Sequence, residues 1–363
     1  MNTAITPKFL KKLYNTPELV IDKLNLTYVS HKNLVIFRKA KDDKFFYVKK
    51  DKPINSKPII ERIESLVIPP AWENVKISDL ENGHLQAVGR DVKNRKQYRY
   101  HPLWNKIRNQ TKFYRMYQFG NQLPKIRAQV DMDLEQKGWT KTKVLALIIR
   151  LLEETHIRIG SEQYAKRNKT YGLSTLRNRH VNIYKDRIKF EFVGKKGKEH
   201  SVTLRNKKLM RLVQKCEEIP GWELFQYYDE YGEKQSVDSG LVNQYLKDIT
   251  GMGFTAKDFR TWAATMIFFD KLSEFKEPEN DKEIKSNILK AYDAAASGLG
   301  NTRNVCRKYY VHPMLPEMYE KGELKKEFQK ADADETPYIN FSNTEKVILN
   351  LLKNYVPEFS AVK

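Results

Sequence analysis

The stretch Ser297-Gly-Leu-Gly-Asn-Thr-Arg-Asn-Val-Cys-Arg-Lys-Tyr-Tyr-Val-His-Pro313 combines glycines, an amide, several cations and two adjacent tyrosines. Within it, Tyr310 lies nine residues after Asn301. Three earlier stretches carry groups of matching chemistry, namely Arg158-Ile-Gly160, the Gly194-Lys195 turn and Lys257-Asp-Phe-Arg-Thr261. Two arginines, a turn lysine, an amide and a late tyrosine are the groups needed to attack a phosphodiester without a metal ion. We therefore expect these four stretches to meet in the fold.

The composition is that of a folded and strongly basic protein. Its 363 residues are 40% apolar and 12% aromatic, and 66 Lys and Arg against 45 Asp and Glu leave a net charge of +21. Such an excess of one sign destabilises a compact chain unless something anionic is the partner. Nucleic acid is the first candidate and a membrane surface the second. A basic but merely solvated surface is the alternative.

The sequence does not suggest a disulfide-stabilised, metal-binding or membrane protein. The two cysteines, Cys216 and Cys306, cannot form a disulfide framework or a zinc cluster, and the seven histidines show no metal-ligand spacing. The N-terminus has no basic region followed by an apolar run, and the longest apolar run, residues 144–149, is too short to span a bilayer. We expect a cytoplasmic protein that needs no cofactor and no metal and has no membrane partner.

Residues 1–110 are rich in predicted strands. Segments 34–37 and 45–48 flank a charged connection as a hairpin would, and residues 84–88 form another predicted strand. If the basic segment that follows is extended, Tyr98 and Tyr100 share one face, with Gln97 and Arg99 on the other. Aromatic and amide groups among cations suit a surface that holds phosphates and touches base edges. An ordinary basic strand with core tyrosines is the alternative.

From about residue 111 the apolar period becomes helical. The predicted helices are 142–156, with Gly160 as a candidate stop, one that contains 259–267 with Arg260 in its first turn, 286–296 with Ser286 as a candidate cap, and 344–355. Strands 188–193 and 201–204 form a hairpin with Lys195 at its tip. The fold class is therefore α+β, with a small β-rich N-terminal domain over 1–110 and a mainly α-helical domain over 111–363.

These residues suit metal-free cleavage of a phosphodiester by a tyrosine. The phenol must lose a proton although its ordinary pKa is about 10. Arg158 and Arg260 could clamp the non-bridging oxygens and stabilise a nearby phenolate, and Asn301 could add a neutral hydrogen bond. Lys195, assisted by Lys257, could protonate the departing 5′ oxygen. Side-chain chemistry alone does not choose between Tyr310 and its neighbour.

Several motifs occur in one order along most of the chain. They are Ile68-Pro-Pro-Ala-Trp72, residues 89–100, 153–160, 171–176, 192–195, 257–261 and Gly300-Asn301 followed by Tyr310. In these motifs and their order the chain resembles the type IB DNA topoisomerases of the small form found in poxviruses and many bacteria. That family has a small β-rich N-terminal domain and a mainly helical catalytic domain on a fold related to that of the tyrosine recombinases. Its catalytic lysine lies on a β-hairpin.

The resemblance implies a role for each matched residue. Arg158 and Arg260 would contact the scissile phosphate, Lys195 would be the general acid supported by Lys257, and Tyr310 would be the nucleophile. The family places this tyrosine nine residues after a histidine or asparagine, which favours Tyr310 over Tyr309. Asn301 stands where poxvirus members carry histidine, so it keeps a hydrogen bond but no charge. The DNA-binding residues implied are Gln97, Tyr98, Tyr100 and Tyr164.

The reaction implied is ATP- and metal-independent relaxation of supercoiled DNA. Transesterification to a 3′-phosphotyrosyl link would let the free 5′ strand swivel before religation. The resemblance further implies a monomer that clamps double-stranded DNA and associates with the nucleoid.

Three alternatives stay open at this point. A tyrosine recombinase uses a similar set of residues, but it would carry a helical N-terminal domain and a histidine three residues before the second arginine, where this chain has Lys257. A non-catalytic basic DNA-binding protein would bind with steep salt dependence and form no covalent adduct. A metal-dependent nuclease would need clustered carboxylates, which the sequence does not suggest.

Overall fold

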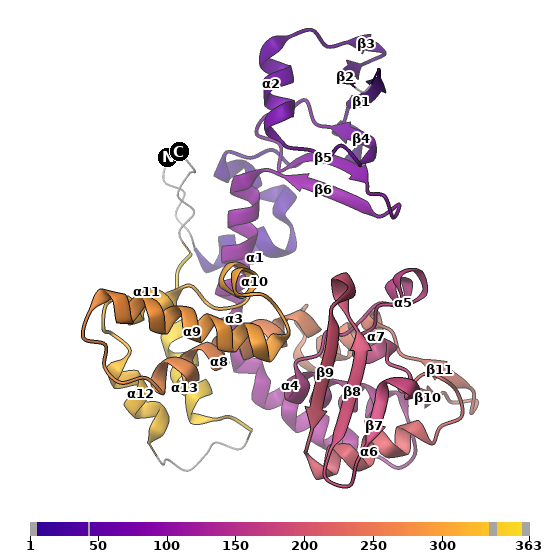
Figure 1. Cartoon of the computed structure of the whole chain (residues 1–363), viewed down its shortest axis with the longest axis vertical. Coiled ribbons are helices and arrows are strands. Elements are labelled where there is room, and N and C mark those ends of the chain that lie inside the picture. The colour runs from indigo at the N-terminus through magenta and orange to yellow at the C-terminus, as the bar shows by residue number, and fades with distance from the viewer. Residues whose placement is uncertain (1–5, 43, 334–339, 358–363) are drawn as a thin grey trace. The chain divides into compact units, whose positions relative to one another are not determined.

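The computed structural model describes residues 6–42, 44–333 and 340–357 (Figure 1). The chain divides into two compact units, one running from Met116 to Asn354 and the other containing the residues up to Arg115. Strands dominate the first unit and helices the second, so the α+β class predicted from the sequence is confirmed. The assignment of DNA binding to 1–110 and of catalysis to 111–363 stays a prediction, because the compactness of a unit does not by itself reveal its function.

The first unit is built on an antiparallel six-stranded sheet in the order β3-β2-β1-β4-β5-β6. Its strands are β1 Ile36–Lys41, β2 Lys44–Lys49, β3 Lys52–Pro53, β4 Glu73–Ile77, β5 Leu85–Arg90 and β6 Lys96–Tyr100. The predicted hairpin is confirmed, but Lys41 pairs with Lys44, so its turn is tighter than the charged connection suggested. Helix α2, Lys57–Ser65, buries Ile63 against Ile36 and Ile77 on one face of this sheet.

A second cluster of the first unit packs around short helices. The helices are α1 Pro7–Asn15, η1 Pro17–Leu19, η2 Ile21–Leu24 and η3 His31–Asn33. Phe9, Leu13 and Ile21 pack with Trp104 and Ile107. The last two belong to α3, Pro102–Leu134, a helix that continues from the first unit into the second.

The Ile68-Pro-Pro-Ala-Trp72 motif wraps its carbonyl groups around one guanidinium. Arg38 on β1 donates to the carbonyl oxygens of Ile68, Pro69 and Pro70 at 3.1–3.3 Å, and also to that of Trp72. Prolines supply carbonyl acceptors but no N–H donor, so a charged donor is needed to satisfy this turn. The motif therefore has a structural role in the first unit.

The second unit is assembled around α4. Its helices are α4 Lys141–Thr155, α5 Glu162–Asn168, α6 Lys207–Glu217, α7 Ser239–Thr250, α8 Ala256–Ser273, α9 Asp281–Leu299, α10 Arg303–Tyr309, α11 Met314–Glu320, α12 Lys325–Asp332 and α13 Asn343–Leu352, with the short η4 Leu173–Thr175, η5 Asn178–His180 and η6 Lys195–Gly197. No side chain among 144–149, Leu151 and Leu152 is more than 2% exposed. Helix α4 packs against α6, α7 and α8 and against a small sheet, so it is the buried centre of this unit.

The small sheet carries the predicted lysine hairpin. Strands β7 Val181–Ile183, β8 Ile188–Val193 and β9 Glu199–Leu204 lie in the order β7-β8-β9, and β8 and β9 are joined through η6. A separate two-stranded hairpin is formed by β10 Gln226–Tyr228 and β11 Lys234–Ser236. The predicted pairing of β8 with β9 across the lysine turn is confirmed.

Two predicted helix starts and one predicted stop residue are wrong in detail. Helix α4 ends at His156, as the predicted range 142–156 requires, but the left-handed residue that stops it is His156 itself, with φ 52°, and not Gly160. Helix α9 begins before Ser286, because the Asn280 side chain caps it by accepting the backbone N–H of Glu283 at 3.0 Å. Helix α8 begins at Ala256, so Arg260 lies beyond its first turn.

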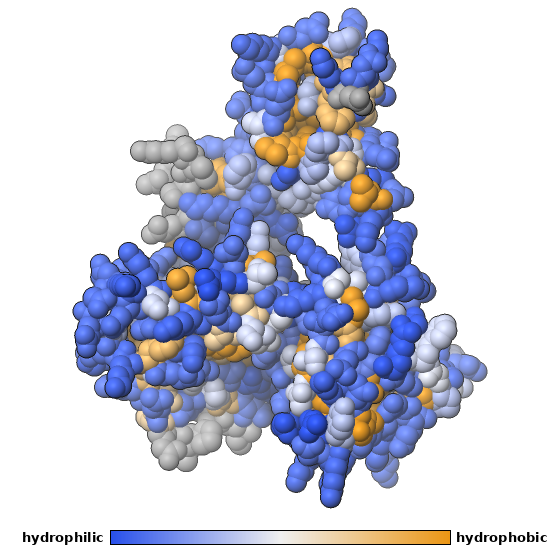
Figure 2. Space-filling view, viewed as in Figure 1, coloured by the Kyte–Doolittle hydropathy of each residue, from blue (hydrophilic) through white to orange (hydrophobic). Residues whose placement is uncertain are grey.

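The visible surface of both units is mainly hydrophilic, as Figure 2 shows. Among the residues that the structure describes, no helix is long and apolar enough to cross a membrane.

A buried ion network fastens the closing helix α13 to the second unit. Arg127 on α3 donates to both carboxylate oxygens of Glu345 at 2.8 Å and to Glu153 at 2.9 Å. The Trp262 indole also donates to Glu345, at 2.9 Å. Because Glu345 accepts from two side chains that are themselves largely buried, its carboxylate joins α3, α8 and α13.

Replacing Glu345 by alanine is expected to lower the free energy of unfolding by about 3–5 kcal/mol, because it leaves the Arg127 charge buried with one partner fewer. Urea unfolding followed by circular dichroism measures this loss. The matched control is Glu274→Ala, which breaks an exposed pair with Lys271 and should cost less than about 1 kcal/mol. Equal losses in the two variants would show that the network does not stabilise the unit.

Candidate active site

Arg260 is held in place by the carboxyl-terminal ends of two helices. Its guanidinium donates to the carbonyl oxygen of His156, at the end of α4, and to that of Leu299, at the end of α9, the latter at 2.9 Å. The residue is only 4% exposed. Burial lowers the pKa of the guanidinium, and the nearby Arg158 lowers it further. Both acceptors are carbonyls that an α-helix leaves unpaired at its end, so the helix ends fix the orientation of this cation.

The Nε atom of Arg260 is buried and has no hydrogen-bond partner among the described residues. A buried donor of this kind is costly unless something accepts from it. Phosphate oxygens fit guanidinium donors well. The unpaired Nε is therefore suited to an anionic substrate atom.

Arg158 and Asn301, which are 143 residues apart in sequence, meet through a hydrogen bond. The Arg158 guanidinium donates to the Asn301 amide oxygen. Arg158 follows the end of α4, and Asn301 follows Gly300, which ends α9 in a left-handed conformation with φ 60°. The Asn301 amide nitrogen has no hydrogen-bond partner among the described residues, and its neighbour Cys306 offers at best a weak sulfur acceptor. This amide thus keeps a donor for another group.

Tyr310 ends helix α10 beside the two arginines. The Arg260 guanidinium carbon lies 5.5 Å from the centre of the Tyr310 ring. Burial alone would raise the pKa of this phenol, but Arg260, Arg158 and Lys257 outweigh it and the pKa is lowered. The Thr265 hydroxyl on α8 donates to the Tyr310 carbonyl oxygen at 3.3 Å, which ties the backbone to the same helix that carries Arg260.

Tyr309 occupies a different environment on the same short helix. It is 44% exposed, and the cation over its ring is the neighbouring Lys308, at 5.4 Å. The ring of Tyr310, by contrast, lies beneath the buried Arg260. The geometry therefore favours Tyr310 as the reactive phenol.

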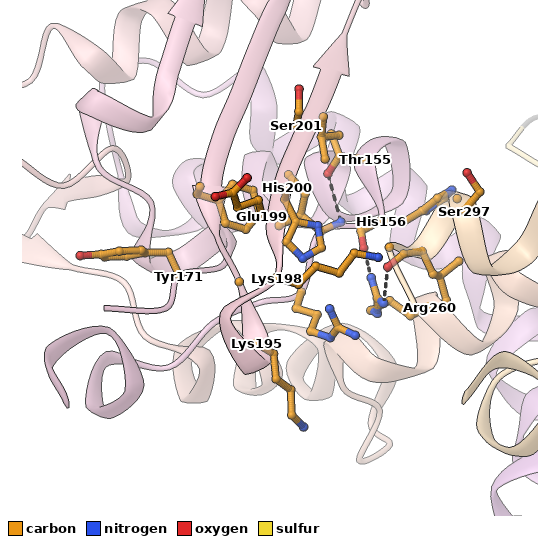
Figure 3. Close-up of a pocket in the computed structure, with 18 of the residues that line it drawn as sticks. Thr155, His156, Tyr171, Lys195, Lys198, Glu199, His200, Ser201, Arg260 and Ser297 are labelled. Carbon is orange, nitrogen blue, oxygen red and sulfur yellow. Dashed lines mark hydrogen bonds between the residues drawn. The ribbon is translucent and has the colours of Figure 1, made fainter. Parts of the chain in front are cut away.

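A pocket of about 370 Å³ lies between the hairpin and the ends of α4 and α9 (Figure 3). It is lined by Arg158, Lys195, Lys198, His200, Arg260 and Gly300 among others. Lys195 sits at the exposed hairpin tip, where Lys196 and Gly197 both have positive φ. In Figure 3 its side chain points away from His156 and His200, out of the pocket. The structure thus brings Lys195 to the rim of the pocket and not into its centre.

The remaining predicted residues are exposed or belong to the first unit. Lys257 is exposed one turn before Arg260, and Tyr164 on α5 is 46% exposed. On β6, the rings of Tyr98 and Tyr100 stack with centroids 5.9 Å apart, so the predicted shared face is confirmed. The Gln97 amide donates to Asp91 at 2.9 Å and is therefore already engaged.

One pocket residue, His200, was not singled out from the sequence. It faces the same side of the hairpin as Phe192, and the two rings stack with centroids 5.1 Å apart. The pairing of 188–193 with 201–204 could have revealed this face, but not the pocket beside it. No group of three or more potential metal ligands occurs in the described ranges.

Comparison with known proteins matches both parts of the chain. Residues 97–336 match the family described as eukaryotic DNA topoisomerase I, catalytic core, and residues 44–91 match the bacterial DNA topoisomerase IB N-terminal domain. The chain is 35% identical over 331 residues to DNA topoisomerase 1B of Acanthamoeba polyphaga mimivirus, covering 88% of this chain and 95% of that protein. It is 26% identical over 236 residues to DNA topoisomerase 1B of Vaccinia virus (strain Copenhagen), covering 64% of this chain and 71% of the relative. Human DNA topoisomerase 1 is 26% identical over 220 residues, 58% of this chain and 27% of that protein.

Both matching families and all three of these relatives are DNA topoisomerases. The chain belongs to the type IB DNA topoisomerase family. It is an isomerase, and DNA is the anionic partner that the net charge predicted. The family match sets aside the tyrosine recombinase and the non-catalytic DNA-binding protein.

Lys257 offers a test of how the cations act on Tyr310. Lys257→Met removes one of the charges that lower the pKa of this phenol, so the limb of the pH–rate profile on which the rate rises as the phenol ionises should move to higher pH. Cleavage at neutral pH should slow by about two- to fivefold, the effect of losing one exposed charge. Single-turnover cleavage of a labelled duplex between pH 5 and 10 measures both. Lys308→Met is the matched control, and an equal shift in that variant would refute a specific effect of Lys257.

Proposed function

We propose that Tyr310 attacks one DNA strand and forms a 3′-phosphotyrosyl link, with Arg158, Arg260, Lys195, Asn301 and Lys257 as the other active-site residues. The phenol loses its proton, its oxygen bonds to phosphorus and the bond from phosphorus to the 5′ oxygen breaks. A proton supplied to that oxygen completes the step. Religation is the reverse, so supercoils relax without ATP or a divalent ion. The placement of Tyr310 under the buried Arg260 carries this proposal.

The two arginines stabilise the charge that builds on the non-bridging oxygens. Arg260 cannot turn away, because two backbone carbonyls hold its guanidinium. Arg158 is oriented by Asn301, whose amide nitrogen remains to donate to a substrate oxygen. Donors fixed before the substrate arrives need little reorganisation in the transition state, and each is worth about 3 kcal/mol of barrier.

Lys195 is the general acid for the 5′ oxygen. Its exposed position at a tip with two positive-φ residues lets the side chain turn inward once DNA covers the pocket. It would then lie beside Arg158 and Arg260, which line the same pocket. Lys257, on α8, supports Lys195 in its role as general acid.

The first unit contributes part of the surface that binds DNA. Strand β6 is the edge strand of its sheet and carries the Tyr98–Tyr100 pair between basic residues. We assign DNA binding to residues 1–110, with Gln97, Tyr98 and Tyr100, and catalysis to 111–363, with Tyr164 as a further contact. We further propose that the enzyme acts as a monomer that clamps duplex DNA in the cytoplasm, associated with the nucleoid.

Tyr98→Ala is expected to weaken DNA binding by about tenfold, because it removes an exposed ring from a basic surface. The rate of cleavage of fully bound DNA should not change, since Tyr98 takes no part in the chemical step. Binding isotherms and single-turnover cleavage separate the two effects. Tyr98→Phe keeps the ring and should bind like the wild type. A slower chemical step with unchanged affinity would contradict the assignment.

Plasmid relaxation tests the proposed function as a whole. Negatively supercoiled plasmid is incubated with the protein in EDTA and without ATP, and the topoisomers are resolved on a gel. We expect complete relaxation through intermediate topoisomers. Binding of the plasmid with no change in linking number, or a strict need for a divalent ion, would contradict the proposal.

A further inference from the structure

His200 lies where the lysine hairpin meets the end of α9. It is the second residue of β9 and pairs across the hairpin with Phe192, and the two rings stack with an interplanar angle of 12°. In Figure 3 its ring lies in the pocket among Lys198, His156 and Arg260. A ring packed in this way has little rotational freedom, so its position defines the space around it.

Two glycines flank the imidazole so closely that neither has room for a side chain. A Cβ atom on Gly194 would lie 2.5 Å from Cδ2 of His200, and one on Gly300 would lie 2.7 Å from Cε1. The backbone of Gly194 is extended, with φ −97°, so only the histidine ring excludes a side chain there. Gly194 directly precedes Lys195, and Gly300 directly precedes Asn301. One ring therefore fills the gap between the segments that carry these two predicted active-site residues.

The charges around His200 explain how it can occupy this place. Arg158, Arg260, Lys195 and Lys198 line the pocket with it, and Glu199 is the one acidic residue among the described residues of the lining. Burial lowers the pKa of His200 to about 4, and Arg158, Lys198 and Arg260 contribute to the shift. The ring is neutral at neutral pH, so it packs between the two segments without repelling the arginines.

We propose that His200 is a positioning residue, which holds the hairpin tip against the end of α9 so that Lys195 and the Arg158–Asn301 pair act on the same phosphodiester. This inference rests on the proposed role of Lys195 as general acid. His200 touches neither reacting atom. It sets the distance between the groups that do.

A substrate with sulfur in place of the bridging 5′ oxygen isolates this role. Tyr310 still bonds to phosphorus and the phosphorus–sulfur bond breaks, but the thiol that leaves has a pKa of about 8.5 and departs as a thiolate without a proton. His200→Ala should slow cleavage of the ordinary substrate by roughly 100-fold, the cost of a misplaced catalytic group. With the sulfur substrate the deficit should shrink to about threefold, because general acid catalysis is no longer needed.

Matched variants separate positioning from folding. His180, also in the second unit, has a neutral ring packed 4.4 Å from that of Tyr171, and burial lowers its pKa to about 4 as well. His180→Ala should show no preference for the sulfur substrate. Gly194→Ala should impair cleavage of the ordinary substrate because its methyl group meets His200. The double variant Gly194→Ala/His200→Ala removes that clash and should be no slower than His200→Ala alone.

Lys195→Ala is the reference variant, because it removes the proposed general acid itself. Its loss of cleavage rate should also shrink when the sulfur substrate replaces the ordinary one. If Lys195→Ala is rescued but His200→Ala is equally slow on both substrates, the inference about His200 is wrong while the role of Lys195 stands. If Lys195→Ala is not rescued, the acid assignment fails and the inference falls with it. A double variant slower than either single variant would also overturn the close contact on which the inference depends.

Discussion

Replacing Tyr310 by phenylalanine is expected to abolish plasmid relaxation and the covalent protein–DNA adduct. The change removes one oxygen and keeps the ring beneath Arg260, so DNA binding should stay within about twofold of the wild type, while the cleavage rate falls by more than about 10⁴-fold, as for other lost nucleophiles. Relaxation gels, adduct formation on denaturing gels and a binding isotherm measure the three quantities.

Tyr309→Phe is the matched control, since it makes the same chemical change one residue away. Its ring is 44% exposed and the cation over it is Lys308, so relaxation should persist. Activity that survives in Tyr310→Phe and disappears in Tyr309→Phe would transfer the nucleophile to Tyr309. Loss of activity in both variants, with loss of DNA binding, would indicate damage to α10.

Arg260→Lys is expected to slow single-turnover cleavage by about 100- to 1000-fold although the positive charge is kept. One ammonium group cannot satisfy the carbonyl oxygens of His156 and Leu299 and still reach a phosphate with fixed geometry. Removal of the planar guanidinium also leaves a buried carbonyl without a donor, so the melting temperature should fall as well.

Arg303→Lys controls for a general effect of changing arginine to lysine near α9. Arg303 forms an exposed pair with Asp293 and should tolerate the change with less than about twofold loss of activity. Quenched-flow experiments at saturating enzyme concentration measure the rate of single-turnover cleavage for both variants. Equal activity of Arg260→Lys and the wild type would show that charge alone, and not the held guanidinium, serves the reaction.

Local periodicity predicted much of the second unit. The apolar side chains of 144–152 recur at helical spacing, and the alternation in 188–193 indicates a strand, so α4 and the β8–β9 hairpin could be placed from the sequence. Helix α3 could not, because its apolar residues face different surroundings along its length and Pro124 lies inside it. The end of α4 was placed correctly at His156, but its stop was assigned to Gly160, because His156 takes the left-handed conformation that a glycine usually supplies.

Chemistry and the family resemblance named candidate residues, but the contacts between them come from the fold. The Arg158–Asn301 bond joins residues 143 apart, and Arg260 reaches a carbonyl 104 residues away. No local sequence pattern can predict contacts between residues so far apart along the chain. The sequence also cannot predict that the Lys195 side chain points outward or that the His200 ring fills the gap beside Gly194 and Gly300. Both features depend on how the hairpin packs against α9.

Identification of the atom to which DNA becomes attached tests directly whether Tyr310 is the nucleophile. The wild-type enzyme is mixed with labelled duplex in EDTA, denatured during the reaction, and digested with trypsin and nuclease before fragment-ion mass spectrometry. We predict a nucleotide on Tyr310, linked through its 3′ phosphate, and a free 5′-hydroxyl on the other fragment of the same cleaved strand. An adduct on Tyr309 or any other residue, a 5′-phosphate link, or cleavage with no covalent protein would contradict it.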